Sequence, residues 1–309
     1  MDLAIISALL LGGLVLLIWG ADRFIEASSK IAIQLGVSEL VIGLTLVAFG
    51  TSAPEVFVGI VSVLNNNANI AAGTVIGSNI ANIGLIFGVS MFAFIGTKDR
   101  ARIPLICLAL SVIILYISLI DLSINFYESL VFLIVFLIFL FGLRNLDNHV
   151  QQVVDKFELR EVVIAIISLA ALIGGAQLTV ENSEKLALLI GIPETIIGLT
   201  IIALGTSLPE LAASIAALYK QKGQMVIGNI LGSNVFNIVT VIPIIGLNLQ
   251  TNIDPQLLHK DIWYLFTLTG IFILVTLTQS KLTKSIFKLS GCLMIGIYCL
   301  YIFTTFFNL

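Results

Sequence analysis

The sequence has very little charge. Only 11% of its 309 residues are Asp, Glu, Lys or Arg, whereas 59% are hydrophobic and the mean hydropathy is +1.12. Soluble globular domains carry about 25% charged residues, so this composition excludes an ordinary soluble protein. Apolar stretches of about 20 residues, the length at which a helix crosses about 30 Å of hydrocarbon, recur along the whole chain. The chain is therefore predicted to be an integral membrane protein.

Residues that bind soft metals are also scarce. The three cysteines are scattered through apolar runs, and the two histidines fall in predicted loops. Zinc and copper sites are built from imidazole and thiolate ligands, so this scarcity disfavours them. The apolar stretches contain no Ser–His pair and no pair of Asp residues, so we do not expect an intramembrane enzyme.

The long apolar stretches predict the fold class, an all-α polytopic membrane protein with ten transmembrane helices. Strands of a membrane barrel are about ten residues long and alternate with period two, which these stretches do not. We place the spans at 3–26, 38–64, 69–95, 102–121, 125–144, 160–180, 193–218, 224–248, 261–279 and 284–307.

The basic residues predict the orientation of these spans. If the N-terminus lies outside, 13 of the 15 Lys and Arg residues fall in inner loops, and only Lys185 and Lys260 fall outside. This bias is the positive-inside rule. We therefore expect a multi-pass protein of the cytoplasmic (inner) membrane, in contact with the lipid bilayer, with both termini outside and the polar linker 146–159 inside.

One segment of the sequence occurs twice. Residues 36–88 and 191–243, which are 155 positions apart, are identical at 19 aligned positions. Five predicted spans separate the copies, and because five is odd the second copy enters the membrane in the opposite sense. This predicts two inverted five-helix repeats, 1–145 and 160–309, on either side of the linker. Inverted repeats of this kind are typical of secondary transporters.

Each copy carries an acidic residue within an apolar run, in GTSAPE ending at Glu55 and in GTSLPE ending at Glu210. An ionised carboxylate at membrane depth costs several kcal/mol, so an intramembrane acid is a functional-site hypothesis by default. All 15 Lys and Arg residues fall in loops or at the ends of the spans, so none is expected to pair with either acid. The Pro and Gly residues of both motifs predict a break just before each Glu, which would free backbone carbonyls as ligands, among them those of Ala48 and Ala203.

Hydroxyl and amide side chains surround these acids at helical spacing. Thr and Ser lie four and three residues before each Glu, and the next span of each copy offers Ser and Asn four residues apart in GSNIAN and GSNVFN. A lone Ser or Thr in such a helix usually bonds its own backbone, but here the whole set recurs. Every proposed ligand is an oxygen, as Ca²⁺ prefers. The candidate site residues are Glu55, Glu210, Thr51, Thr206, Ser52, Ser207, Ser78, Ser233, Asn82, Asn237, Ala48 and Ala203.

These paired motifs resemble the α-repeat signatures G-T-S-x-P-E and G-S-N-x-x-N of the calcium/cation antiporter superfamily, and within it the prokaryotic sodium/calcium exchangers. The resemblance covers all ten predicted helices. It implies that the first and sixth helices slide against a core formed by the others. It also implies Ca²⁺ ligation by Glu55 and Glu210, with backbone oxygen from Thr51 and Thr206. The implied flanking Na⁺ sites use the Ala48 carbonyl with Ser78 and the Ala203 carbonyl with Ser233, with Ser52 and Ser207 nearby and Asn82 and Asn237 as the central pair.

The chain departs from many relatives at this central pair, where they carry Asp at one or both positions. With Asn82 and Asn237 the formal charge of the site is −2, which matches one Ca²⁺ or two monovalent ions. We therefore expect a Na⁺/Ca²⁺ antiporter but do not expect electrogenic three-for-one exchange. Two alternatives stay open. A H⁺/Ca²⁺ antiporter is disfavoured because proton-coupled relatives typically show G-N-x-x-E, and a cation channel because channels normally use rotational symmetry. We expect no cofactor, no nucleic acid and no obligate protein partner.

Overall fold

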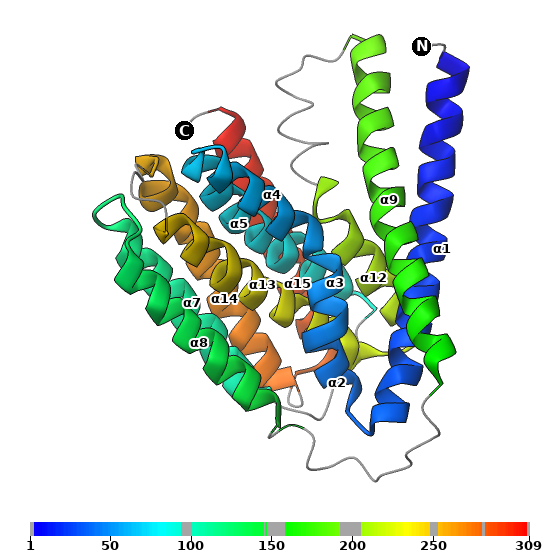
Figure 1. Cartoon of the computed structure of the whole chain (residues 1–309), viewed down its shortest axis with the longest axis horizontal. Helices are drawn as coiled ribbons and strands as arrows, with labels where there is room; N and C mark the ends of the chain where they lie inside the picture. Colours follow the sequence, from blue (N-terminus) through cyan, green and yellow to red (C-terminus); the bar gives the residue numbers. More distant parts are fainter. Residues whose placement is uncertain are drawn as a thin grey trace.

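The computed structural model describes residues 3–93, 101–144, 146, 158–191, 205–247, 253–279 and 282–307. Within these ranges the regular elements are all helical, which confirms the predicted all-α class (Figure 1). Eight continuous helices are long and apolar enough to cross a membrane. They are α1 (Leu3–Leu35), α5 to α6 (Ala68–Ser90), α7 (Arg102–Leu119), α8 (Phe126–Arg144), α9 (Leu159–Leu189), α13 (Gly223–Gly246), η4 to α14 (Leu257–Thr278) and α15 (Lys284–Phe306).

The second predicted span is broken, as the sequence predicts. Its first part, Glu39–Thr51, contains α2 (Glu39–Ile42), η1 (Gly43–Val47) and α3 (Ala48–Thr51), and its second part is α4 (Ala53–Leu64). The two parts are bent by 49° at Ser52. Pro54 lies in the first turn of α4, where its missing N–H removes no helical hydrogen bond.

The matching span of the second copy, predicted at 193–218, is described only in its later part. That part is α12 (Leu208–Tyr219), and it again begins with a proline in its first turn, Pro209. Residues 192–204, with the predicted break and Ala203, lie outside the described residues. The described residues therefore contain nine spans if the bent pair is counted as one.

Helix α13 forms the centre of the bundle and is almost completely buried. It packs against α8, α7 and α5 on one side and against the broken second span on the other. Glycines permit the second contact, because a Cβ at Gly43 would lie 2.7 Å from the Met225 carbonyl and a Cβ at Gly228 would lie 2.6 Å from the Leu40 carbonyl. Close backbone approach at small residues is the usual way in which helices pack in membranes.

Helices α1 and α9 pack against each other over their length and stand at one side of the bundle (Figure 1). They run antiparallel, because Gly13 faces Thr179 whereas Gly20 faces Leu172. Both helices are longer than the predicted spans 3–26 and 160–180. Hydropathy falls where charged residues begin, but charged side chains with long stems are good helix formers, so the helices continue beyond the apolar stretch.

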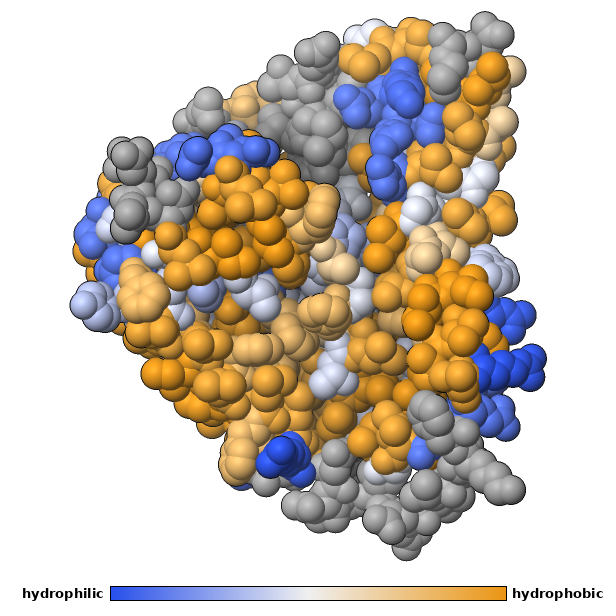
Figure 2. Space-filling model, viewed as in Figure 1, coloured by the Kyte–Doolittle hydropathy of each residue, from blue (hydrophilic) through white to orange (hydrophobic). Residues whose placement is uncertain are grey.

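The outer surface of the bundle is apolar. On the face shown in Figure 2, hydrophobic residues cover most of the helices and hydrophilic residues gather in separate patches. Large apolar side chains such as Leu11, Val15 and Ile18 of α1 and Ile166 of α9 are exposed by more than half. A surface of this kind suits lipid contact and not water.

Candidate functional site

The structure brings the two sequence copies together in one buried cluster. The Ser52 hydroxyl of the first copy donates to Oε1 of Glu210 over 3.0 Å. The Ser233 hydroxyl of the second copy donates to the Ala48 carbonyl over 3.4 Å, and Asn237 Nδ2 donates to the Ser78 hydroxyl over 3.1 Å. Each of these bonds joins residues more than 150 positions apart, so the cluster depends on both copies.

The two glutamates lie at the centre of this cluster and are fully buried. Glu55 is in the first turn of α4 and Glu210 in the first turn of α12, where the positive end of the helix dipole favours a negative charge. The carboxylates are close enough to repel each other. Among the described residues, no Lys or Arg forms an ion pair with either of them.

Many oxygens of the cluster have no hydrogen-bond partner among the described residues. They include both carboxylate oxygens of Glu55, Oε2 of Glu210, Oδ1 of Asn82, Oδ1 of Asn237 and the hydroxyl of Ser207, which lies beside Glu55. Buried polar atoms without a partner cost several kcal/mol each in an apolar medium. An oxygen-coordinated cation would satisfy them. No group of three or more His, Cys, Asp and Glu residues suited to a metal is found in the described part of the chain.

The prediction that the break frees the Ala48 carbonyl is wrong for this conformation. That carbonyl accepts the Ser52 N–H over 3.0 Å and also the hydroxyls of Thr51 and Ser233, each over 3.4 Å. The physical reason is that the helix continues to Thr51 and closes its last turn with the Ser52 N–H before it bends. The corresponding carbonyl of Ala203 lies outside the described residues.

Two asparagines of the signatures, Asn79 and Asn234, join α5 to α13. Asn79 Nδ2 donates to the Asn234 carbonyl over 3.1 Å, and Asn79 Oδ1 accepts from Asn237 Nδ2 over 3.4 Å. Next to them, α5 passes at Asn82 into a π-helical turn, η2 (Asn82–Phe87). Single π-turns inside α-helices are frequent at functional sites.

Two residues of the cluster were not predicted from the sequence, Asn229 and Ser214. Asn229 accepts from the Thr51 hydroxyl over 3.1 Å and donates to the Ser214 hydroxyl over 3.1 Å. The two copies differ at these positions, so a search for shared residues passes over them. Helical spacing was a usable signal, because Asn229 lies four residues before Ser233 and Ser214 lies four residues after Glu210.

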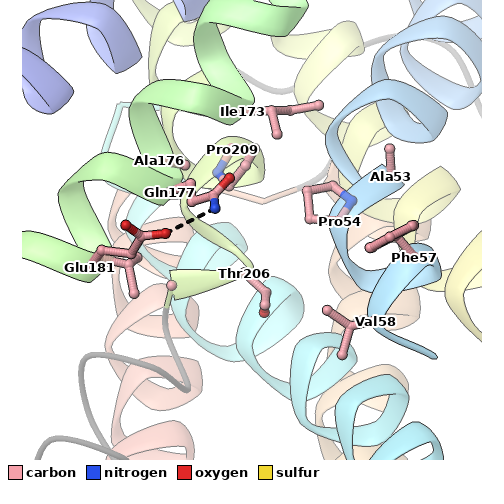
Figure 3. Close-up of a pocket in the computed structure, with 12 residues that line it drawn as sticks. Ala53, Pro54, Phe57, Val58, Ile173, Ala176, Gln177, Glu181, Thr206 and Pro209 are labelled. Carbon is pink, nitrogen blue, oxygen red and sulfur yellow. Dashed lines mark hydrogen bonds between the residues drawn. The ribbon is translucent and has the colours of Figure 1, made fainter. Parts of the chain in front are cut away.

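A cavity of about 520 Å³ approaches the cluster between α4, α9 and α12 (Figure 3). Its walls are mainly apolar and include Pro54 and Pro209, each next to a site glutamate. Thr206, which is half-buried, also lines it. Its polar side chains on α9 are Gln177 and Glu181, and Gln177 Nε2 donates to Glu181 Oε1 over 2.9 Å.

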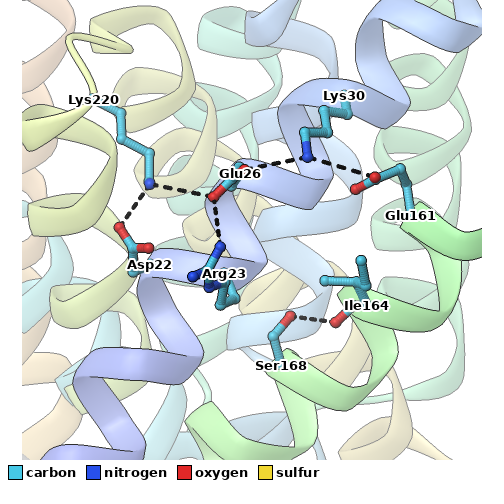
Figure 4. Close-up of polar contacts among 8 residues, drawn as sticks. All are labelled: Asp22, Arg23, Glu26, Lys30, Glu161, Ile164, Ser168 and Lys220. Atoms are coloured by element: carbon cyan, nitrogen blue, oxygen red, sulfur yellow. Dashed lines mark hydrogen bonds and ion pairs between the residues drawn. The ribbon is translucent and has the colours of Figure 1, made fainter.

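The other end of the α1–α9 pair is joined to the bundle by ion pairs (Figure 4). Lys220, which follows α12, lies 2.6 Å from Asp22 and 3.9 Å from Glu26 of α1. Lys30 of α1 bonds Glu26 over 3.2 Å and Glu161 of α9 over 3.5 Å. These charges hold α1, α9 and α12 together at the end opposite to Glu181.

Buried acids and hydroxyls at the centre of a polytopic helical protein are typical of membrane transport proteins, in which such residues line the ion pathway. The sequence profile of the sodium/calcium exchanger protein family matches residues 5–144 and 160–307. The chain belongs to this family. Family membership supports a cation/Ca²⁺ antiporter, a transporter and not an enzyme.

Individual relatives agree with this family. The chain is 32% identical to the sodium/calcium exchanger MaX1 of Methanosarcina acetivorans, over 77% of this chain and 82% of that protein. It is 34% identical to inner membrane protein YrbG of Escherichia coli, over 89% of each chain. The solved structure of the sodium-calcium exchanger NCX_Mj without Na⁺ and Ca²⁺ superposes with a TM-score of 0.83 at 30% identity, covering 98% of this chain and all of that one.

Proposed function

We propose that the protein exchanges Ca²⁺ for Na⁺ across the cytoplasmic membrane at a central site built around Glu55 and Glu210. One observation carries this proposal. Two fully buried carboxylates, one from each sequence copy, lie in one cluster with unpartnered oxygens and no basic partner among the described residues. Mobile cations are the charges that would offset them. Neutral oxygens from Thr, Ser and Asn residues complete a set that suits Ca²⁺ and Na⁺.

The proposed architecture is two inverted five-helix repeats, 1–145 and 160–309, which together give ten transmembrane helices. The antiparallel packing of α1 on α9, the first helix of each half, supports it. The contacts between the two signatures support it as well, because Ser52 of the first copy bonds Glu210 and Asn237 of the second copy bonds Ser78.

The ion roles follow from charge and position. Ca²⁺ binds between Glu55 and Glu210, and Na⁺ occupies flanking positions near Ser78 and Ser233. The fixed charge of −2 balances one Ca²⁺ or two Na⁺, because Asn82 and Asn237 are neutral. Exchange of two Na⁺ for one Ca²⁺ therefore moves no net charge through the membrane.

In the proposed cycle, this conformation is the one that opens to the outside. The cavity lies toward the end of α9 that carries Glu181, which the distribution of basic residues assigns to the outer face. The ion pairs of Lys220 and Lys30 close the inner end. Alternating access then consists of sliding of the α1–α9 pair against the other helices, as in transporters that rock around a fixed midplane site.

Coupling follows from the cost of moving an empty site. Two carboxylates without a cation would have to cross a closed, dry state, and the desolvation penalty of each buried charge is several kcal/mol. Ca²⁺ or Na⁺ removes this penalty, so the loaded protein reorients and the empty protein does not.

Neutralising either glutamate tests the proposed site. We expect Glu55→Gln and Glu210→Gln each to reduce uptake of radiolabelled Ca²⁺ by reconstituted protein about 100-fold or more, because loss of one charged partner at a buried site costs about 3–5 kcal/mol. The exposed loop acid Asp121 offers a control, since Asp121→Asn should transport normally. A normal exchange rate in either glutamine variant, with wild-type yield and elution, would refute the site.

A further inference from the structure

Asn229 makes three side-chain hydrogen bonds within the cluster. It lies on α13, is 1% exposed, and uses both ends of its amide. Its Oδ1 accepts the Thr51 hydroxyl over 3.1 Å, and its Nδ2 donates to the Ser214 hydroxyl over 3.1 Å and to the Glu210 backbone carbonyl over 3.4 Å. One side chain thus joins α3 of the first copy to the first turns of α12 in the second.

This connection breaks the symmetry of the two copies. The position that corresponds to Asn229 in the first copy is Thr74, and the position that corresponds to Ser214 is Gly59. A threonine hydroxyl has a single proton to donate and sits on a short stem, whereas the Asn229 amide donates to two partners and accepts from a third. The counterpart of Thr51 differs too, because Thr206 lines the cavity whereas Thr51 is fully buried.

The Thr51 hydroxyl has two acceptors among the described residues, Asn229 Oδ1 at 3.1 Å and the Ala48 carbonyl at 3.4 Å, and the bond to Asn229 is the shorter. Thr51 lies beside the Glu210 carboxylate, which already accepts one hydrogen bond from Ser52 on Oε1. A hydroxyl has a single proton, so Thr51 cannot donate to Asn229 and to Glu210 fully at the same time. Oε2 of Glu210 has no partner among the described residues, which fits a Thr51 proton held elsewhere.

We propose that Asn229 is a positioning residue of the ion site, which holds the Thr51 hydroxyl away from Glu210 and so keeps one carboxylate oxygen of Glu210 for the cation. The inference rests on the proposed function, because it assumes that Glu210 binds the transported ion. Without Asn229, the Thr51 hydroxyl turns to Glu210 and competes with Ca²⁺ for that oxygen. Ca²⁺ affinity falls, while the movement that carries the ion is unchanged.

The test is a double-mutant cycle on Ca²⁺/Ca²⁺ exchange in proteoliposomes, which needs no other coupling ion. We expect Asn229→Ala to raise the KM for Ca²⁺ about tenfold, which corresponds to about 1.4 kcal/mol, with kcat changed by less than about twofold. Thr51→Val removes the competing donor at nearly constant shape. In that background Asn229→Ala should raise KM by less than about twofold, because no hydroxyl is left to redirect.

Two further variants make the test robust. The repeat counterpart Thr74→Ala is the matched control and should keep the wild-type KM, because Thr74 is half-buried and its hydroxyl has no hydrogen bond to another side chain of the described residues. If Asn229→Ala is not recovered as folded protein, Asn229→Thr, which places the first copy's residue in the second, should show the same rise in KM.

The outcomes separate this inference from the proposed function. Normal Ca²⁺/Ca²⁺ exchange by Glu210→Gln would overturn the proposed site. If that variant is inactive but Asn229→Ala keeps the wild-type KM, the site stands and the role of Asn229 is wrong. A tenfold rise that persists in full in the Thr51→Val background would show a packing role for Asn229 and would also overturn the inference.

Discussion

The contact between α1 and α9 makes a sharp prediction at Gly20. A Cβ at this position would lie 2.5 Å from the Leu172 backbone nitrogen and 2.8 Å from the Ser168 carbonyl oxygen. Carbon contacts are comfortable at about 3.5–4.0 Å, so Gly20→Ala would force the two helices apart by roughly 1 Å. The obstructing atoms are backbone and cannot rotate away. Overpacking of this kind costs about 1–3 kcal/mol.

Gly12 provides the control on the same helix. It is exposed, and a Cβ there would meet nothing within 4 Å. Both substitutions improve helix propensity equally, by about 1 kcal/mol, so their difference isolates the contact with α9. We expect Gly12→Ala to raise the thermal midpoint of the purified protein in detergent and Gly20→Ala to lower it. A midpoint for Gly20→Ala equal to or above that for Gly12→Ala would refute close packing of α1 on α9.

The remaining predictions concern the inner ion pairs and the charge of the site. Lys220→Ala should change the ratio of apparent Ca²⁺ affinities on the two faces of the membrane, by up to about fivefold, because a partly exposed ion pair contributes up to about 1 kcal/mol. The exposed Lys288→Ala is its control, and equal ratios in both would contradict a closing role for Lys220. Asn237→Asp adds a third carboxylate and changes the fixed charge of the site from −2 to −3. A site of charge −3 balances three Na⁺ but only one Ca²⁺, so Ca²⁺ uptake by this variant should respond to membrane potential. Uptake that stays independent of voltage in this variant would show that fixed charge does not set the ion ratio.

The spans and their arrangement could be predicted from the sequence to a large extent. Apolar length is a local property, so α7 and α8 lie within two residues of their predicted ends. The ends of α1 and α9 could not be predicted in the same way. Beyond the predicted span 3–26, α1 continues through Lys30, whose charge is offset by Glu26 and by Glu161 of α9, and hydropathy does not record those partners. Beyond the predicted span 160–180, α9 continues through Glu181, Glu184 and Lys185, where the apolar stretch has ended.

The site was predicted where the two copies agree and missed where they differ. Glu55 and Glu210 occupy matching positions in both motifs, and the structure brings them together in one buried cluster. The first copy has Thr74 and Gly59 at the positions that correspond to Asn229 and Ser214, and because Gly59 has no side chain the first copy cannot form the same hydrogen bond. The Ala48 carbonyl was predicted to be free of helical hydrogen bonds, but it accepts the Ser52 N–H. The sequence predicts that the helix breaks near Pro54, but it does not predict which N–H closes the last turn before the break.

The most direct test of the account is uptake of radiolabelled Ca²⁺ into proteoliposomes at clamped voltage, with Na⁺, K⁺ and H⁺ gradients imposed one at a time. The proposed function predicts that an outward Na⁺ gradient alone drives uptake, and that the rate does not change with voltage because a site of charge −2 exchanges two Na⁺ for one Ca²⁺. Uptake that ignores the Na⁺ gradient and follows the pH gradient would contradict Na⁺ coupling and establish H⁺/Ca²⁺ exchange in its place.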